Sequence, residues 1–310
     1  MKKIGVIGGS GFIGSHITKK FLKEGYRVKV SATDIKKGEK YKHLWGLKNA
    51  DNLQIQQLNV TNKEQLQDFI GDCNIMIHGG TPFKLDVKDP QTELFDPTIK
   101  GTENFLEVIN KTLSIEKVVF IASVAAYNTN FPMPAGNKNP DDTFNENDTP
   151  FTSEESHPYA QAKFIANQTV EKFIKDHPQS NFEITSVSPV FVTGKSLSNR
   201  EDSTSTGMQF LFKNKLAPNA FIQMLYDIDA EFAMVDVKDV ANSIYKAATT
   251  KGLQGENYLL SSESYKVSDI SRMLNRQVPI NKPKTIYNNS LANQDLAVNF
   301  LSAEKSLHEY

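Results

Sequence analysis

The sequence predicts an α/β fold with a doubly wound parallel sheet, and two observations support this. Short apolar runs of strand length alternate with amphipathic helical segments over residues 1–190 and again over 230–260. The chain also opens with a strand, a glycine-cornered turn and a helix, the arrangement that begins a Rossmann-type sheet. Residues 191–229 and 261–310 fit this alternation poorly. We expect them to form a smaller mixed lobe over the carboxyl edge of the sheet, where such sheets bind ligands.

The predicted strands are apolar runs bounded by turn residues, at 3–7, 27–31, 53–58, 74–78, 117–122 and 183–188. The two longest helical patterns cover 93–111 and 159–175, and Ser156 and Pro158 supply helix-start chemistry for the second. The stretch 128–156 is polar and rich in Pro, Asn and Asp, which favours a long loop beside a site.

Composition limits the kinds of partner. Thirty-five basic residues balance 36 acidic ones, so no field of one sign indicates nucleic acid or an anionic membrane, and we expect a small-molecule partner. Cys73 is the only cysteine, which excludes an intramolecular disulfide and thiolate zinc sites and is typical of a reducing compartment. The histidines show no metal-ligand spacing, and no window approaches a membrane span. We therefore expect a cytoplasmic protein without a metal.

The glycine turn predicts a nucleotide site. Gly8, Gly11 and Gly14 follow the first apolar run at three-residue intervals. Residues without a Cβ suit a tight turn, the approach of a pyrophosphate to the backbone and close packing of helix on strand. The helix start at Phe12 and Ile13 then offers unpaired N–H groups and a positive dipole end to phosphates.

Tyr159 and Lys163 form a second constellation, because a spacing of four places both side chains on one helix face. A nearby cation favours the phenolate, so we expect the pKa of Tyr159 to fall from about 10 toward the working range for proton transfer. Ser123 ends a strand at the carboxyl edge of the sheet, where its hydroxyl can bond the substrate oxygen that is protonated. The alternatives are an ordinary helical Tyr/Lys pair and a serine that bonds local backbone.

Six motifs carry a resemblance to a known family: the glycine turn, HGGTP at 78–82, VVFIAS at 118–123, YAQAK at 159–163, SPVFVTG at 188–194 and MVDVKDVA at 234–241. In this order, they resemble the extended short-chain dehydrogenase/reductases, which are NAD-dependent epimerase/dehydratase-like, over most of the chain. Residues 78–82 and 192–194 are most similar to the branch of dihydroflavonol reductases, cinnamoyl-CoA reductases and similar aldehyde or ketone reductases.

The resemblance implies a Ser-Tyr-Lys triad. In this triad Ser123 orients the carbonyl, Tyr159 gives the proton, and Lys163 holds the nicotinamide ribose while tuning Tyr159. The resemblance also places five residues at the cofactor. Asn59 and Val60 border the adenine, Pro189 and Val190 lie beside the nicotinamide, and Gly79 is a further cofactor contact. Asn59 stands where the family usually has Asp.

The end of the second strand bears on the choice of cofactor. An acid there accepts hydrogen bonds from the ribose of NAD, whereas a cation pairs with the 2′-phosphate of NADP. Thr33 stands where the reductase branch commonly has Arg, and Asp34 lies one or two places beyond the acid expected for NAD. Lys36, Lys37 and Lys40 follow at once; alternatively, they form a solvated charge run. We favour NADP over NAD.

Substrate contacts are the least defined by the sequence, and the candidates are Pro82, Tyr127 and Asn128. Asn128 falls where flavonoid-type reductases often place a substrate-contacting Asn, and the alternative is a loop asparagine that bonds its own backbone. A set of large apolar residues is expected to pack in the core or the lobe, and alternatively to line an apolar substrate pocket. The set is Trp45, Met208, Phe210, Phe212, Phe221 and Met224.

Three polar residues are expected to serve the fold rather than the chemistry. His78 ends an apolar strand, which favours a structural histidine. Asp236 and Asp239 stand at a helix start and are expected to act as capping acids.

The predicted activity is hydride transfer from a nicotinamide cofactor to the carbonyl of a small apolar aldehyde or ketone, or the reverse oxidation. One alternative is a nucleotide-sugar epimerase with a retained cofactor, since Ala126 and Tyr127 resemble the epimerase pattern. Val124 and Ala125 stand where dehydratases have Asp-Glu. A nucleotide-binding redox sensor without catalysis is the other alternative, and the intact Tyr159/Lys163 pair counts against it. The family resemblance also allows a homodimer through two long helices.

Overall fold

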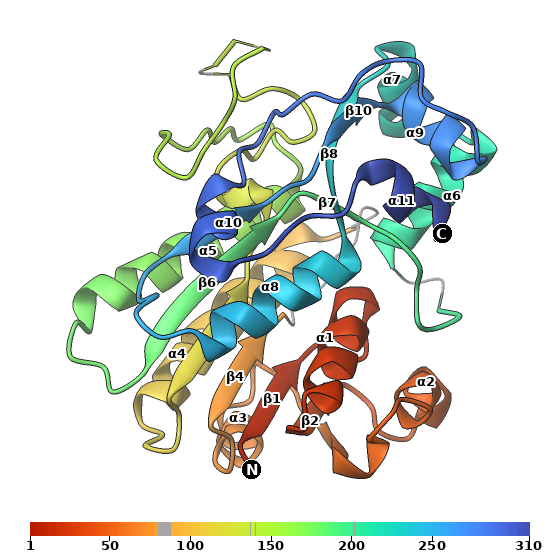
Figure 1. Cartoon of the computed structure of the whole chain (residues 1–310). Coiled ribbons are helices and arrows are strands. Elements are labelled where there is room, and N and C mark those ends of the chain that lie inside the picture. The colour runs from red at the N-terminus through yellow and green to blue at the C-terminus, as the bar shows by residue number, and fades with distance from the viewer. Residues whose placement is uncertain (80–87, 137, 140, 201–202) are drawn as a thin grey trace.

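The computed structural model describes residues 1–79, 88–136, 138–139, 141–200 and 203–310. Seven strands of this chain form a parallel sheet in the order β3-β2-β1-β4-β5-β6-β9 (Figure 1). They are β1 Lys3–Ile7, β2 Arg27–Ala32, β3 Leu53–Gln57, β4 Ile75–His78, β5 Lys117–Ile121, β6 Glu183–Pro189 and β9 Asn257–Leu260. The order reverses between β1 and β4, where such sheets bind ligands. The predicted parallel sheet is confirmed.

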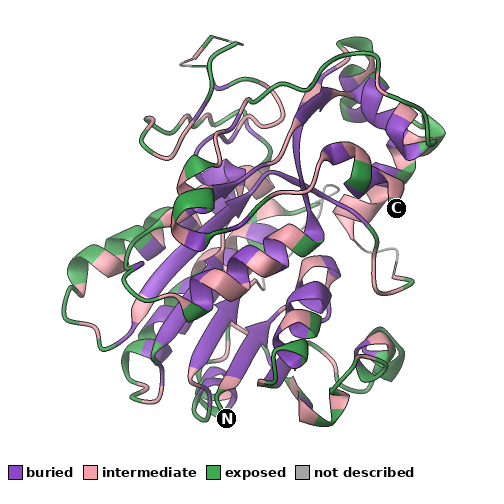
Figure 2. Cartoon of the chain, viewed as in Figure 1, coloured by how far each residue is buried: buried purple, intermediate pink, exposed green. Residues whose placement is uncertain are grey.

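Helices cover both faces of this sheet, and each face has its own apolar core (Figure 2). On one face lie α1 Phe12–Lys23 and α8 Val237–Thr249; on the other lie α3 Lys63–Ile70, α4 Asp96–Asn110 and α5 Pro158–Asp176. Successive side chains of a strand point to opposite faces. Ile4 and Val6 of β1 accordingly belong to the core with α1 and α8, and Ile7 belongs to the other core. Burial on both faces explains the continuous apolar strands.

A second, smaller sheet joins β7 Phe191–Thr193, β8 Glu231–Asp236 and β10 Ser264–Lys266. β8 lies between the others, parallel to β7 and antiparallel to β10. The helices around it are α6 Thr204–Asn214, α7 Ala220–Asp227, α9 Val267–Leu274 and α11 Ala303–His308. A third core containing Phe191, Phe212 and Phe232 unites these elements. The predicted mixed lobe is confirmed, and in Figure 1 it lies at the end of the sheet opposite to the start of β1.

Two segments depart from the predicted division of the chain. The sequence assigns 230–260 to the large sheet, but β8 of this range pairs with β7 and β10 in the smaller one. The tail 261–310 is assigned to the lobe, but α10, Ser290–Leu296, adds Ala292 and Leu296 to the core with α1 and α8. Partners distant in sequence decide both placements, so local alternation does not reveal them.

The helix starts largely follow the predicted chemistry. α5 begins at Pro158, and the α4 pattern opens with a π-helical turn at Gln91–Phe95. Asp236 is the N-cap of α8 and accepts a hydrogen bond from the Lys238 amide at 2.7 Å, as predicted. Asp239 lies one turn further on and instead accepts from the Leu301 amide at 2.7 Å. Among the described residues, 128–156 contains only isolated bridges, as expected for a loop.

The expectation that the apolar set packs inside is wrong for four of its members: Trp45, Phe210, Phe221 and Met224 are 36% to 53% exposed. On α6 the inward positions are Met208 and Phe212, four residues apart, so Phe210 lies on the outer face of the same helix. Helical period, and not apolar content, decides which of these side chains is buried.

Phe212→Ala should lower the free energy of unfolding by about 3–5 kcal/mol, because it removes a fully buried ring from the lobe core. The matched control is Phe210→Ala, on the same helix, whose ring is 51% exposed and whose cost should stay below about 1 kcal/mol. Urea denaturation measures both. Equal losses would contradict the assignment of Phe212 to the lobe core.

Candidate active site

The carboxyl edge of the large sheet brings together the turn after β1, Ser123 after β5, and Pro189 and Val190 at the end of β6. Parallel strands end at a common edge, so residues distant in sequence meet there. Pro189 and Val190 are buried, and the Val190 amide donates to the Leu260 carbonyl at 3.1 Å. This edge is the candidate site.

The glycine turn has the shape that a phosphate group requires. Gly8 has φ 82°, and a Cβ on Gly14 would lie 2.0 Å from the Gly8 carbonyl oxygen. Gly11 is the N-cap of α1 and has no side chain to bond the first helical amides, those of Phe12 and Ile13. These amides and the helix dipole fit a dinucleotide pyrophosphate.

The end of β2 carries the predicted mixture of charges. Thr33 is exposed, and Asp34 accepts from the Lys36 amide at 3.0 Å. The Lys37 ammonium lies 3.7 Å from the Asp34 carboxylate, and Lys40 is exposed one turn further on. Both an acid and cations are therefore present at this end of the strand.

Ser123, Tyr159 and Lys163 meet at the same edge. The Ser123 and Tyr159 hydroxyl groups are hydrogen-bonded, and Ser123 Oγ also accepts from the Ala125 amide at 3.2 Å. Lys163 is buried one helical turn beyond Tyr159, and its ammonium donates to the Ile121 carbonyl at 3.0 Å. The serine and the helical pair thus converge as one cluster.

Burial controls the protonation of this cluster. It raises the pKa of Tyr159 above its ordinary value, and the hydrogen bond with Ser123 opposes that shift. Burial also lowers the pKa of Lys163 to about 8. The expected fall in the pKa of Tyr159 is therefore wrong for this structure, because removal of the phenol from water outweighs the hydrogen bond with Ser123.

His78 is structural, as expected, although its bonding is incomplete. Its ring packs against those of Phe105 and Phe120, with centroid separations of 4.6 and 5.1 Å. Burial first, and the Lys163 charge second, lower the pKa of His78 to about 3, so its imidazole is neutral. Within the described residues, His78 Nε2 has no hydrogen-bond partner. His78 and Lys163 both line a cavity of about 20 Å³. That volume fits one water molecule.

The remaining cofactor candidates lie at or just beyond strand ends. The Gly79 amide donates to the Ile7 carbonyl at 3.1 Å, and a Cβ on Gly79 would meet the Ile121 side chain at 2.7 Å. Asn59 accepts from the Thr61 amide at 3.1 Å and is exposed, while Val60 is half-buried.

The two described substrate candidates are held by the fold. The Tyr127 hydroxyl donates to the Asn257 carbonyl at 2.7 Å. The Asn128 amide group donates to the Met133 carbonyl and to the Tyr287 hydroxyl, each at 2.9 Å. These bonds match the alternative in which Asn128 organises its own loop, and the substrate contacts stay a prediction. Pro82 lies outside the described residues.

Arg200 also reaches the turn, and nothing in its sequence context indicates this. Its Nη1 atom donates to the Ser10 carbonyl at 3.1 Å. The two residues are 190 positions apart, and Arg200 lies in a polar segment without a motif. Only the tertiary structure therefore reveals the contact.

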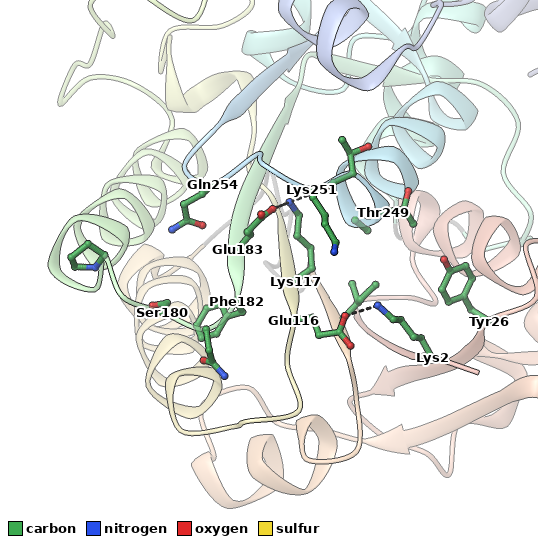
Figure 3. Close-up of a pocket in the computed structure, with 15 residues that line it drawn as sticks. Lys2, Tyr26, Glu116, Lys117, Ser180, Phe182, Glu183, Thr249, Lys251 and Gln254 are labelled. Carbon is green, nitrogen blue, oxygen red and sulfur yellow. Dashed lines mark hydrogen bonds and ion pairs between the residues drawn. The ribbon is translucent and has the colours of Figure 1, made fainter.

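A larger cavity of about 520 Å³ lies at the opposite, amino edge of the sheet (Figure 3). Four of its charged side chains form ion pairs: Lys117 with Glu183 at 2.7 Å, and Lys2 with Glu116. Burial lowers the pKa of Lys117, and the bond to Glu183 opposes this. The glycine turn and the Ser-Tyr-Lys cluster lie elsewhere, so this cavity is not the candidate active site.

Across the described ranges, no group of three His, Cys, Asp or Glu side chains is placed to hold a metal ion. In the same part of the chain, no helix combines the length and apolar character needed to span a bilayer.

Comparison with known proteins supports the family and the fold. The model of the NAD dependent epimerase/dehydratase family matches residues 4–261. Cinnamoyl-CoA reductase CAD2 of Medicago truncatula is 29% identical over 279 residues, 88% of this chain and 80% of that protein. The NADPH-dependent methylglyoxal reductase GRE2 of Saccharomyces cerevisiae is 28% identical over 294 residues, 89% of this chain and 83% of the relative. The crystal structure of yeast methylglyoxal/isovaleraldehyde reductase Gre2 with NADPH has a similar fold, with a TM-score of 0.80 and 24% identity, covering 99% of this chain and 96% of the other.

Gly14→Ala should abolish NADPH binding and destabilise the fold, because its Cβ would overlap the Gly8 carbonyl at 2.0 Å and neither backbone can yield. Gly207→Ala is the matched control: no heavy atom lies within 4 Å of its Cβ, and alanine favours a helix by about 0.5–1 kcal/mol. Thermal unfolding and NADPH titration follow both variants. Normal binding by Gly14→Ala would contradict the described turn.

Proposed function

Because this chain belongs to the NAD dependent epimerase/dehydratase family, we propose that it reduces the carbonyl of a small aldehyde or ketone with a nicotinamide cofactor. The observation that carries the proposal is the meeting of Ser123, Tyr159 and Lys163 at the edge that holds the glycine turn. The named activities of the relatives, which are reductases, agree with the oxidoreductase predicted from the sequence.

The chain's own residues fit a dinucleotide. The turn Gly8–Gly14 would hold the pyrophosphate, Asn59 and Val60 the adenine end, and Pro189 and Val190 the nicotinamide end. When bound, the nicotinamide supplies the hydride. We propose NADPH over NADH, since Lys37 and Lys40 are exposed where a 2′-phosphate would lie and a relative is named NADPH-dependent.

The three polar side chains divide the proton chemistry. Tyr159 keeps its proton at neutral pH because burial raises its pKa, so it can donate that proton to the substrate oxygen. Ser123 is hydrogen-bonded to the same phenol and can bond the same substrate oxygen, which positions the carbonyl. Lys163, with a pKa of about 8, is charged below that pH and stabilises the negative charge that Tyr159 gains.

The lobe over this edge would bind the rest of the substrate, which we propose is a small apolar carbonyl compound. Val124 and Ala125, buried after Ser123, offer no carboxylate at the place where dehydratases have one. The Tyr159/Lys163 pair favours catalysis over a non-catalytic sensor. Exchangeable cofactor distinguishes a reductase from an epimerase. We also propose a cytoplasmic location. The homodimer stays a prediction.

The test is a panel of aldehydes and ketones assayed with NADPH and with NADH by the absorbance of the reduced nicotinamide. Tyr159→Phe should lower turnover by roughly 100-fold or more, because it removes the proton donor, while cofactor affinity should change only a few-fold. Tyr245→Phe, which removes a hydroxyl from α8, is the matched control and should keep its activity.

Three other results of this assay would contradict the proposal. NADPH binding without reduction of any carbonyl would favour the sensor. Cofactor that stays bound through purification, with no net oxidation, would favour the epimerase. Unchanged turnover in Tyr159→Phe would remove the phenol from the mechanism.

Turnover in the reductive direction should decline as the pH rises through about 8, because Lys163 has its pKa there. Below that pH the ammonium is protonated and stabilises charge on Tyr159; above it the neutral amine does not. Lys163→Arg keeps its positive charge across this range, so any activity it retains should lack the decline. The pH profile of kcat measures this, and a flat wild-type profile would contradict the role of Lys163.

A further inference from the structure

We propose that Arg200, from the segment that follows β7, binds the pyrophosphate of the dinucleotide. This inference rests on the proposed function, because it concerns the same cofactor site. Arg200 Nη1 donates to the Ser10 carbonyl at 3.1 Å and lies 3.4 Å from Ser10 Oγ. Ser10 precedes Gly11, the N-cap of α1, so the guanidinium contacts the turn that leads into this helix.

The segment that carries Arg200 is anchored at two points. Gly194, with φ 109°, leaves the end of β7, and its amide donates to Gln209 Oε1 at 2.9 Å. The next residue, Lys195, has its carbonyl 2.9 Å from His16 Nε2 on α1. These two contacts hold the backbone between the lobe and α1, and the Arg200 side chain of the same segment contacts the turn.

Both the charge and the shape of the guanidinium suit a pyrophosphate. It is planar, always protonated, and carries five N–H donors in a fork that matches two phosphate oxygens at once. Beside it on α1, the Ser15 hydroxyl bonds His43 Nε2 at 2.8 Å. Burial, followed by the Arg200 charge, lowers the pKa of His43, so this imidazole is neutral at pH 7. Among the described residues, Arg200 places a side-chain cation at the turn itself, whereas Lys37 and Lys40 follow the end of β2.

The experiment compares two fragments of the cofactor that differ in the position of their phosphates. ADP carries a pyrophosphate, and adenosine 2′-monophosphate carries only the 2′-phosphate. Isothermal titration calorimetry of each fragment with the full chain needs no carbonyl substrate and no turnover.

Arg200→Gln should weaken ADP binding by about 10- to 100-fold, the loss expected for a charge-assisted hydrogen bond. Its affinity for adenosine 2′-monophosphate should stay within about twofold, which also shows that the variant is folded. Arg200→Lys should lie between, because it keeps the charge without the fork. Lys195→Gln removes one charge from the same segment through an exposed side chain and should change neither affinity.

Loss of ADP affinity alone supports the proposal. Unchanged affinity for both fragments, an equal loss for both, or a loss confined to adenosine 2′-monophosphate would each overturn it. An equal loss would mean that Arg200 only ties the lobe to the turn. Failure of every carbonyl substrate would count against the proposed function and leave the ADP result as evidence for the pyrophosphate contact.

Discussion

The structure depends on the close approach of α1 to the turn after β1. A Cβ on Gly14 would lie 2.0 Å from the Gly8 carbonyl oxygen, so helix and turn can meet only because residue 14 is glycine. This contact sets where α1 begins and where its first amides point. The same helix packs with α8 in the core on its side of the sheet. The turn that we propose as the phosphate site therefore follows from a packing constraint.

Burial is the second controlling factor, because it shifts the pKa values of the Tyr159 phenol and the Lys163 ammonium in opposite directions. It raises the pKa of Tyr159 and lowers that of Lys163 to about 8, and in both cases it favours the neutral form. The sheet edge supplies this environment: Ser123 follows β5, and α5 brings the other two groups against it. The same geometry that gathers the three side chains thus sets the protonation of Tyr159 and Lys163.

The segment after β7 connects the lobe to the carboxyl edge of the large sheet. Its carbonyl at Lys195 meets His16, and its Arg200 side chain meets Ser10, so the lobe contacts the first helix and the first turn of the sheet. A cofactor held in the turn would therefore contact both sheet systems. This arrangement links cofactor binding to the part of the molecule that we propose contacts substrate.

The sequence by itself determined the parallel sheet, six of its seven strands to within one residue, the glycine turn and the Tyr159/Lys163 spacing, because each of these depends on local periodicity or on neighbours a few residues away. Only the tertiary structure decided that β8 joins the smaller sheet, that α10 packs beside α8, that burial raises the pKa of Tyr159, and that Arg200 reaches Ser10. These features depend on contacts between residues far apart in the chain and on removal from water. Local patterns carry no record of either.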